Sequence, residues 1–474
     1  MRALGVGLTY WPVLSPLFEG DTPAAAVLEL EPQTLWTKVA TAAGWQYRCN
    51  EALLARVAAL PQAKLLHGVG QPLAGATRDP LPHRSLLRQA ADALRVAWVS
   101  EHLSFNRVRR QGGVQEAGFL LPPRQRPAAV RVAADAVRRY GRALGRPVAF
   151  ETGVNYLRPQ RDEMSDGDFF AAVSQAAGCG IVLDLHNLWC NERNGRQRMA
   201  EALRQVPLER VWELHLAGGM PMGSYWLDAH SGAVPEPVMA LAAEWLPRLP
   251  QLGAIIFEIL PEHVPRLGLD GVARQLERLQ ALWALRPPRT LAVPRLHAAA
   301  RRRPAASSSD LAAVAAWESA LVDTLRGQVR PGFGWLAADP GVALLAELVA
   351  DFRRASLSKV LRYTLTLLLG TLGEAETAAL LAAYLVQHPP DSFAAVEAEQ
   401  FTRFLAAHEA MLRRVPHLAE VLAFEQALLR ATLYGESRQL RWSVDPAGLF
   451  EALEAGRVPA AQAALPTTML ITTA

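Results

Sequence analysis

Short apolar runs alternate with amphipathic stretches over the first 285 residues of the chain. The apolar runs predict β-strands, and the amphipathic stretches between them, such as 86–95, 127–144, 168–177 and 238–246, predict helices. The expected strands span residues 3–9, 45–49, 63–67, 96–101, 147–151, 180–184, 210–215 and 254–258. Eight strand-then-helix units in a region of this length are typical of a (β/α)8 TIM-like barrel, an α/β fold; an open, doubly wound sheet is the alternative.

The pattern changes after residue 309, where nearly every stretch has helical periodicity. Residues 286–309 combine Pro, Arg, Ala and Ser without periodicity, as interdomain linkers do, and Asp310 is suited to cap the helix that follows. The sequence therefore predicts a barrel domain (1–285), a linker (286–309) and a mostly α-helical C-terminal domain (310–474). Helices are expected there at 311–326, 342–369, 374–387, 394–414 and 418–433.

Composition narrows the class of protein. Hydrophobic residues make up 51% of the 474 residues and charged residues 20%, which is typical of a soluble globular protein. The net charge of +4 comes from scattered arginines among 45 acidic residues, so nucleic-acid binding is not expected. Three cysteines, Cys49, Cys179 and Cys190, lack the spacing of a disulfide framework, and no uncharged run has the ~18 residues of a membrane span. We expect a cytoplasmic protein that does not bind membranes; its oligomeric state stays open.

Side chains that can bind metals recur where the predicted strands end. Because the C-terminal ends of parallel barrel strands share one face, residues far apart in the sequence meet there. One further pair, Asp228 and His230, follows the seventh strand in a loop. The runs themselves end at His67, at Glu101 and His102, at Glu151, at Asp184 with His186 and Asn187, at Glu213 and His215, and at Glu258.

This convergence predicts a metal centre. Buried carboxylates and imidazoles so close together would be costly without cations. About four to six donors surround one divalent ion, so the set suffices for two or three ions, and its nitrogen and oxygen atoms suit iron, manganese or zinc. The nine expected ligands are His67, His102, Glu151, Asp184, Asn187, His215, Asp228, His230 and Glu258.

Four residues have further possible roles. Glu151 and His186 are the candidate catalytic residues, although His186 could instead donate a hydrogen bond to a neighbour. Glu101 and Glu213 alternate with the ligand positions, so they either face the helices or orient a histidine.

Motifs in the barrel region occur in a fixed order: HGVG (67–70), VSEHLSF (99–105), LLPP (120–123), FETGVNYL (150–157), CGIVLDLHN (179–187), ELHLAGG (213–219), LDAHSGAV (227–234) and IIFE (255–258). On these motifs, residues 4–282 resemble the multinuclear non-heme iron-dependent oxidases (MNIO), typified by methanobactin-biosynthesis enzymes. Members of that family are barrels that hold two or three irons, as Fe2+ or Fe3+. They use O2 to oxidise a residue, often cysteine, in a ribosomally made precursor peptide.

The resemblance also implies how the ligands are shared. One iron would be held by His67, His102 and Glu151. Glu151 would bridge to a second iron, held with Asp184, His215 and Glu258, and a third would be held by Asn187, Asp228 and His230.

The chain departs from the family pattern around these ligands. The family usually has Asn where this chain has Thr152, and Asn is common where this chain has His186. An Asp often follows the last glutamate, where this chain has Ile259 and Leu260, so a base proposed for that Asp is missing. The metal ligands are kept while the pocket differs, so the modified residue and the product do not carry over.

The C-terminal region resembles the helical partner proteins often encoded beside such oxidases. The resemblance rests on SKVLRYTLTLLLG (358–370), YLVQHPP (384–390) and the segment 401–431, in which Pro416, Leu418 and Glu425 carry a recurring phrase. It implies that residues 310–474 recruit the precursor peptide at high effective concentration. The alternative is a helical oligomerisation module.

Two other functions fit the same residues. Barrels with His, Asp and Glu metal sites include xylose-isomerase-like isomerases and phosphodiesterases of the endonuclease type. The other alternative is a non-enzymatic protein that senses metal or redox state through the barrel.

Overall fold

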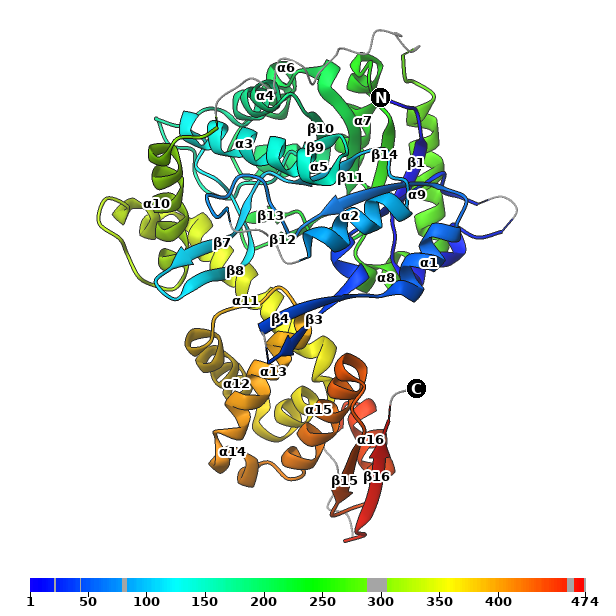
Figure 1. Ribbon diagram of the computed structural model, residues 1–474, viewed down its shortest axis with the longest axis vertical. Helices are drawn as coiled ribbons and strands as arrows, with labels where there is room; N and C mark the ends of the chain where they lie inside the picture. Colours follow the sequence, from blue (N-terminus) through cyan, green and yellow to red (C-terminus); the bar gives the residue numbers. More distant parts are fainter. Residues whose placement is uncertain (21–22, 43, 79–82, 288–304, 458–463, 473–474) are drawn as a thin grey trace. The chain divides into compact units, whose positions relative to one another are not determined.

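The computed structural model describes residues 1–20, 23–42, 44–78, 83–287, 305–457 and 464–472 (Figure 1). Contacts divide the chain into two compact units, which we call the barrel unit and the helical unit. The barrel unit contains Met1–Trp36, Cys49–Val114 and Leu120–Leu345. The helical unit contains Thr37–Arg48, Gln115–Phe119 and Ala346–Ala474.

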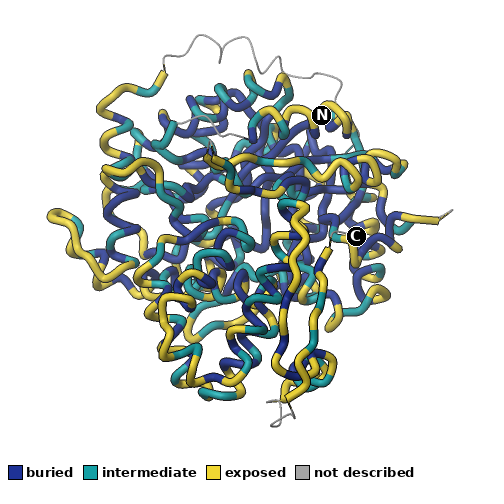
Figure 2. The backbone as a smooth tube through the Cα atoms, turned by 60° about the horizontal axis from the view of Figure 1, so that its bottom comes forward, coloured by how far each residue is buried: buried dark blue, intermediate teal, exposed yellow. Residues whose placement is uncertain are grey.

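Parallel strands close the predicted TIM-like barrel, in the order β1-β14-β11-β10-β9-β6-β5-β2. Each strand is short and almost wholly buried, as expected of strands covered by helices on the outside and by packed side chains within (Figure 2). The strands are β1 (Gly5–Thr9), β2 (Val27–Leu30), β5 (Ala63–Gly68), β6 (Val99–His102), β9 (Val148–Glu151), β10 (Gly180–Asp184), β11 (Val211–Ala217) and β14 (Ala254–Glu258).

The prediction of the second strand was wrong. The second barrel strand is β2, whereas residues 45–49 lie in β4 (Gly44–Cys49), which pairs with β3 (Trp36–Thr41) in a separate two-stranded sheet. β2 has only four residues, one of them charged, so it lacks a recognisable apolar run. The segment of β4 was correctly recognised as a strand from its alternating residues, but its side chains are exposed or half-buried, unlike those of the buried barrel strands.

A layer of apolar side chains fills the barrel interior. Val27, Leu65, Ala149, Val182 and other strand residues pack there with Trp98 and Trp212. Gly180 makes room for this packing, because a Cβ atom at that position would lie 2.1 Å from the Trp212 ring. The filled interior leaves the strand ends as the place for a site.

Helices surround the barrel, and most of those predicted are present. They are α1 (Glu51–Ala59), α2 (Arg84–Ala93), α3 (Pro127–Leu144), α4 (Asp166–Ala177), α5 (Leu185–Arg193), α6 (Met199–Gln205), α7 (Glu236–Trp245), α8 (Val264–Leu267), α9 (Leu269–Trp283) and α10 (Ser308–Leu325). Two further hairpins extend from the strand ends, β7 (Phe105–Arg110) with β8 (Gly113–Leu121) and β12 (Met220–Met222) with β13 (Tyr225–Leu227).

Helix α10 belongs to the barrel unit, although the sequence placed the start of the second domain at residue 310. The Asp310 carboxylate accepts hydrogen bonds from Arg131 on α3 at 2.6 and 3.0 Å, and the Trp317 indole donates to the Pro122 carbonyl. Asp310 is also not the cap itself: Ser307 is the N-cap, and Asp310 completes a capping box three residues on. Most of the expected linker, residues 288–304, lies outside the described residues.

The helical unit has a core of its own, built from α11 (Pro340–Val360), α12 (Arg362–Gln387), α13 (Ala394–Ala406), α14 (Glu409–Arg414), α15 (Leu418–Tyr434) and α16 (Pro446–Glu454). Gly373, with φ of 80°, interrupts α12 close to the predicted break. The Glu425 carboxylate accepts the backbone N–H groups of Tyr363 and Thr364 and so caps α12. A hairpin of β15 (Arg438–Trp442) and β16 (Thr467–Ile471) completes the unit.

Helix α12 is long and apolar enough to cross a membrane by length and composition alone. It carries Glu374 and Glu376, and Leu365, Leu368 and Tyr384 pack into the helical core.

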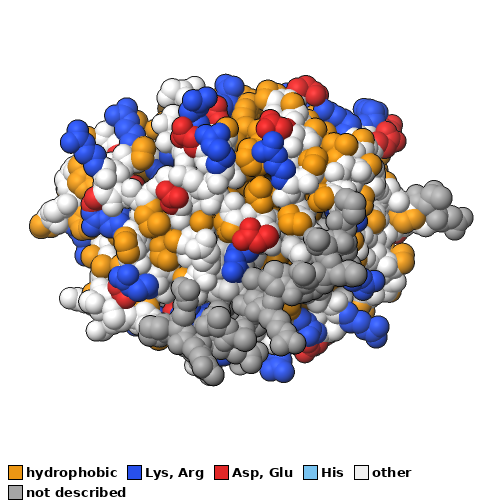
Figure 3. Space-filling model, turned by 90° about the horizontal axis from the view of Figure 1, so that it is seen from above, with side chains coloured by type: hydrophobic (Ala, Val, Ile, Leu, Met, Phe, Trp, Pro, Cys, Tyr) orange, Lys and Arg blue, Asp and Glu red, His pale blue; other side chains and the backbone are white. Residues whose placement is uncertain are grey.

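On the face shown in Figure 3, basic and acidic side chains are interspersed rather than segregated.

Candidate metal centre

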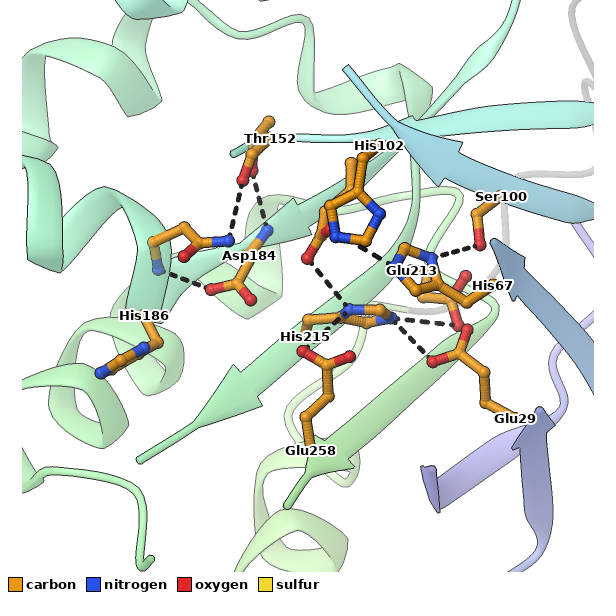
Figure 4. A network of polar contacts seen from close by, with 12 residues as sticks. Glu29, His67, Ser100, His102, Thr152, Asp184, His186, Glu213, His215 and Glu258 are labelled. Atoms are coloured by element: carbon orange, nitrogen blue, oxygen red, sulfur yellow. Dashed lines mark hydrogen bonds and ion pairs between the residues drawn. The ribbon is translucent and has the colours of Figure 1, made fainter. Parts of the chain in front are cut away.

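Strand register places the predicted donors side by side at the barrel mouth. His102 at the end of β6 pairs with Glu151 at the end of β9, and Asp184 on β10 pairs with His215 on β11. Glu258 at the end of β14 pairs with Ala217, which lies two residues after His215 on β11 and therefore faces the same side of the sheet. The register brings together residues that are far apart in the sequence, as Figure 4 shows for His102, His215 and Glu258.

Glu151 lies between two groups of donors. Its Oε2 is 2.9 Å from His102 Nε2 and 3.4 Å from His67 Nε2. Its Oε1 is 3.3 Å from His215 Nδ1, which is also 3.3 Å from Glu258 Oε2. Donor atoms within 4.8 Å of one another form the sets His67–His102–Glu151 and Glu151–Asp184–His215–Glu258. One carboxylate therefore joins two sets, each able to surround a metal ion.

The remaining predicted ligands contact these sets through Glu258 and Asp184. His230 Nε2 is 3.2 Å from Asp228 Oδ1 and 3.4 Å from Glu258 Oε2. The Asn187 N–H donates to Asp184 Oδ1 at 2.6 Å, and its side-chain amide donates to the Thr152 carbonyl. The structure thus brings all nine predicted ligands to the same end of the barrel.

Several donor atoms at this centre are buried without a hydrogen-bond partner in the described part of the chain. They are His67 Nε2, Glu151 Oε2, Asp184 Oδ2, Asn187 Oδ1, His215 Nδ1, His230 Nε2 and Glu258 Oε2. Leaving so many polar atoms unsatisfied would be costly, and these nitrogen and oxygen atoms converge in the sets described above. The donor set therefore fits divalent transition metals.

Neighbouring groups orient the histidines toward this set. His102 Nδ1 donates to the Gly68 carbonyl at 3.0 Å, which leaves Nε2 with the lone pair that faces Glu151. His67 Nδ1 is hydrogen-bonded to Ser100 Oγ at 2.9 Å, and its Nε2 also faces Glu151. A hydrogen bond on the far nitrogen that fixes the near one is the usual arrangement of a metal-binding histidine.

Glu29 is a site residue that the sequence reasoning missed. It is fully buried at the third position of β2, and its Oε1 lies 3.2 Å from His215 Nε2, opposite the nitrogen that faces Glu151. Glu213 approaches the same nitrogen at 3.7 Å and accepts the Trp98 indole N–H at 2.7 Å. Glu213 thus has the orienting position that was one of its two expected roles. Glu29 could have been found only by recognising VLEL as a strand.

The Glu101 carboxylate is hydrogen-bonded to the backbone rather than to the side chains of the predicted ligands. It accepts the backbone N–H groups of Gln71 and His102. A Cβ atom at Gly68 would lie 2.4 Å from Glu101 Oε2, so this glycine lets the carboxylate approach the backbone. Burial raises the pKa of Glu101 to about 7.

His186 is fully buried and both of its ring nitrogens have partners. Trp226 donates its indole N–H to Nε2 at 3.3 Å, and Nδ1 lies 3.0 Å from Asp228 Oδ1. Because an indole can only donate, Nε2 carries the lone pair and Nδ1 the proton that Asp228 accepts. Gly219 is required here, since a Cβ atom would lie 2.6 Å from His186 Nε2. This geometry favours the expected hydrogen-bonding role of His186, and its catalytic role stays a prediction.

Charges in the centre shift pKa values in opposite directions. Burial lowers the pKa of His102, but the Glu151 carboxylate outweighs it and raises this pKa to about 10. Burial raises the pKa of Glu151, yet His102 and His67 hold it well below its usual range. For Asp184, burial and the Asp228 carboxylate raise the pKa well above the ordinary value. Burial of several carboxylates together therefore disfavours the charged form of Asp184, and a cation bound among them would offset this cost.

Comparison with known proteins gives one family. The family model described as "RiPP precursor modification enzyme MbnB/TglH/ChrH" matches residues 22–269, where RiPP denotes a ribosomally synthesised and post-translationally modified peptide. A UPF0276 protein of Anaeromyxobacter sp. (strain Fw109-5) is 33% identical over 206 residues, which cover 43% of this chain and 70% of that protein. A UPF0276 protein of Chromobacterium violaceum is 32% identical over 222 residues, covering 47% and 79%.

Among solved structures, a D-psicose 3-epimerase of Clostridium cellulolyticum H10 is similar, with a TM-score of 0.37 and 12% identity. The similarity covers 60% of this chain and 99% of that one.

Proposed function

Because the chain belongs to the family of RiPP precursor modification enzymes MbnB/TglH/ChrH, we propose that it is an O2-dependent iron oxidase that modifies a residue, often cysteine, of a ribosomally made precursor peptide. The observation that carries the proposal is the cluster of buried, unpartnered donor atoms joined by Glu151. We place this enzyme in the cytoplasm, in keeping with its three free cysteines.

Two or three irons would be shared among the nine donors. His67, His102 and Glu151 would hold one, and Glu151 with Asp184, His215 and Glu258 a second. Asn187, Asp228 and His230 would hold a third. Iron bound there would supply one-electron and O2 chemistry that protein side chains lack.

The chain's own groups keep these ligands in place. The Gly68 carbonyl and Ser100 hold the far nitrogens of His102 and His67. Glu29 and Glu213 face the far nitrogen of His215 in the same way. His186, fixed by the Trp226 indole, holds Asp228 Oδ1 and leaves the other carboxylate oxygen for a metal. Such support limits the reorganisation needed when metal or substrate binds.

Metal content of the full-length protein tests the site. Glu151→Ala removes a donor from both sets, so we expect the variant, purified without oxygen, to hold less than half of the wild-type iron. Glu277→Ala on α9, at an exposed position, is the matched control and should leave iron unchanged. Elemental analysis and Mössbauer spectra give the amount and kind of iron, and circular dichroism checks the fold. Full iron content in folded Glu151→Ala protein would refute the site.

The reaction itself is tested on short peptides encoded beside the gene. We expect co-expression to change the mass of one of them, and the change to require O2 and Glu151. Turnover without O2 would instead indicate isomerase or phosphodiesterase chemistry. If no peptide is modified and the bound iron changes oxidation state with the redox potential of the buffer, the result would favour the non-enzymatic protein that senses metal or redox state.

We also propose that the region 310–474 binds the precursor peptide, chiefly through residues 346–474 of the helical unit. The unit has its own core and exposes apolar side chains, among them Leu369, Val386 and Leu470. Tethered to the enzyme, it would raise the local concentration of peptide. Photo-crosslinking of a modified peptide to the full chain should label residues 346–474. Crosslinks confined to the barrel unit would contradict recruitment and leave oligomerisation as the role of this unit.

A further inference from the structure

A recess of about 200 Å³ lies beside strand β13 in the barrel unit. Tyr156, Arg158, Arg193, Asn194 and Tyr225 are among the residues that line it, together with Arg196. None of the described residues lining the recess is Asp or Glu. A recess with three arginines and no acid of its own has the polarity of an anion-binding site.

Arg193 is held in place by two indole rings. Its guanidinium carbon lies 4.9 Å from the centre of the Trp189 ring and 4.8 Å from that of Trp226, within the range of cation–π contacts. Asn194 fixes Trp226 in turn, accepting its backbone N–H at 2.8 Å and donating to its carbonyl at 3.0 Å. The guanidinium is therefore ordered before any ligand binds, which lowers the entropy cost of binding.

Two of the three arginines are available to a ligand. Arg158 and Arg193 are exposed, and no carboxylate of a described residue lies within 4.0 Å of either guanidinium. Arg196 is different: its side chain is buried, pairs with Asp166 at 2.7 Å, and donates to the Leu157 carbonyl. Arg158 and Arg193 thus form the free positive charge of the recess.

Asp339 is hydrogen-bonded to the backbone of Arg158, a residue that lines the recess, but forms no ion pair with the arginines there among the described residues. Its two carboxylate oxygens accept the backbone N–H groups of Arg158 and Gly341, at 3.0 and 2.9 Å. These bonds hold the backbone of Arg158 and leave its side chain free.

The recess and the metal centre are neighbours along β13. Tyr225 lines the recess, and Asp228 follows it by three residues, a span of about 10 Å in extended chain. Tyr156, which also lines the recess, accepts the Asp228 backbone N–H through its hydroxyl at 3.1 Å. An extended peptide with one residue at the metal centre would therefore reach the recess within about three residues.

We propose that Arg158 and Arg193 form a carboxylate-binding subsite for the peptide substrate, about three residues from the modified position. An Asp or Glu side chain, or the C-terminal carboxylate of the peptide, would supply the group, since Arg binds carboxylates with paired hydrogen bonds. The inference rests on the proposed peptide-modifying function, because it takes the ligand to be a peptide.

Binding of short synthetic peptides to the full-length protein tests the subsite without turnover. Three acetylated probes separate the sources of the carboxylate: Gly-Gly-Glu-Glu-Gly-Gly-amide, Gly-Gly-Gln-Gln-Gly-Gly-amide and hexaglycine with a free C-terminus. Ligand-detected NMR in low-salt buffer measures their affinities. Arg158→Gln/Arg193→Gln is the test variant. Arg204→Gln/Arg266→Gln is the control, because it removes the same charge from exposed positions outside the recess.

We expect the wild type and the control to bind a carboxylate probe at least tenfold more tightly than the Gln-Gln probe, and the test variant to lose this preference. Preference for the Glu-Glu probe identifies an acidic side chain as the ligand, and preference for hexaglycine identifies the C-terminus. Equal loss in the test and control variants, or no preference in the wild type, would overturn the subsite. This binding assay measures neither iron content nor turnover. If the subsite exists but the oxidase proposal is wrong, the carboxylate probe would still bind, while the peptide in the co-expression experiment would stay unmodified.

Discussion

Glu318 on α10 gives a stability prediction that does not involve the metal centre. Its side chain is 2% exposed, and its Oε1 accepts the Ala76 backbone N–H at 2.7 Å. Burial raises the pKa of Glu318 from 4.5 to about 8. Below about pH 4.5 the carboxyl group is protonated in both the folded and the unfolded protein. As the pH rises, the unfolded chain loses this proton first, so stability falls until the folded pKa is passed.

The size of the effect follows from the difference between the two pKa values. A difference of about 3.5 pH units, at ~1.4 kcal/mol per unit, gives a ceiling of about 5 kcal/mol between pH 4.5 and pH 9. Glu318→Gln stays neutral at every pH and keeps an oxygen for the Ala76 N–H. We therefore expect the variant to match the wild type within about 1 kcal/mol at pH 5 and to exceed it by up to about 5 kcal/mol at pH 9.

Urea unfolding of the metal-free, full-length protein at pH 5, 7 and 9 measures this difference, with tryptophan fluorescence as the probe. Taking the difference between variant and wild type cancels the titration of all other groups. Glu277→Gln, the same change at an exposed position of α9, is the control and should show no pH-dependent gain. A Glu318→Gln variant whose advantage is the same at pH 5 and pH 9 would refute the reasoning.

Two further predictions concern single contacts. Trp226→Phe removes the N–H that fixes the tautomer of His186. We therefore expect 15N NMR of the zinc-loaded protein to show a mixture of His186 tautomers, and metal affinity to fall about 10- to 100-fold. The control Trp189→Phe changes an indole that does not make this hydrogen bond, and should have neither effect. In the helical unit, Lys38→Ala leaves the buried Asp391 carboxylate, 2.5 Å from the ammonium, without its cation, and should cost about 3–5 kcal/mol in urea unfolding. The Lys38→Ala/Asp391→Ala double variant should cost less than the sum of the single changes, and strict additivity would contradict this coupling.

The convergence of the candidate metal ligands could be predicted from the sequence because parallel barrel strands place their C-terminal ends on one face. His67, Glu151 and Glu258 each end an apolar run, and this position alone predicts that they meet. The second strand could not be read in this way. Val27–Leu30 has only four residues, one of them the charged Glu29, so neither the strand nor Glu29 was recognised.

The domain boundary shows a different limit of sequence patterns. Helical periodicity after residue 309 identifies α10 as a helix, but the unit a helix joins depends on what its buried face contacts. Asp310, Trp317 and Glu318 bind groups of the barrel unit that lie far away in the chain. Residues 37–48 present the converse case, since they lie between barrel elements in sequence and belong to the helical unit.

By itself, then, the sequence determined the barrel, the helical region and the set of candidate metal ligands, because periodicity and residue type are local properties of the chain. Tertiary structure decided which nitrogen of each histidine faces the centre, that Trp226 holds His186 against Asp228, and that Arg158 and Arg193 share a recess without an acid. These features depend on directions and distances of a few ångströms between segments remote in sequence, which no local pattern encodes.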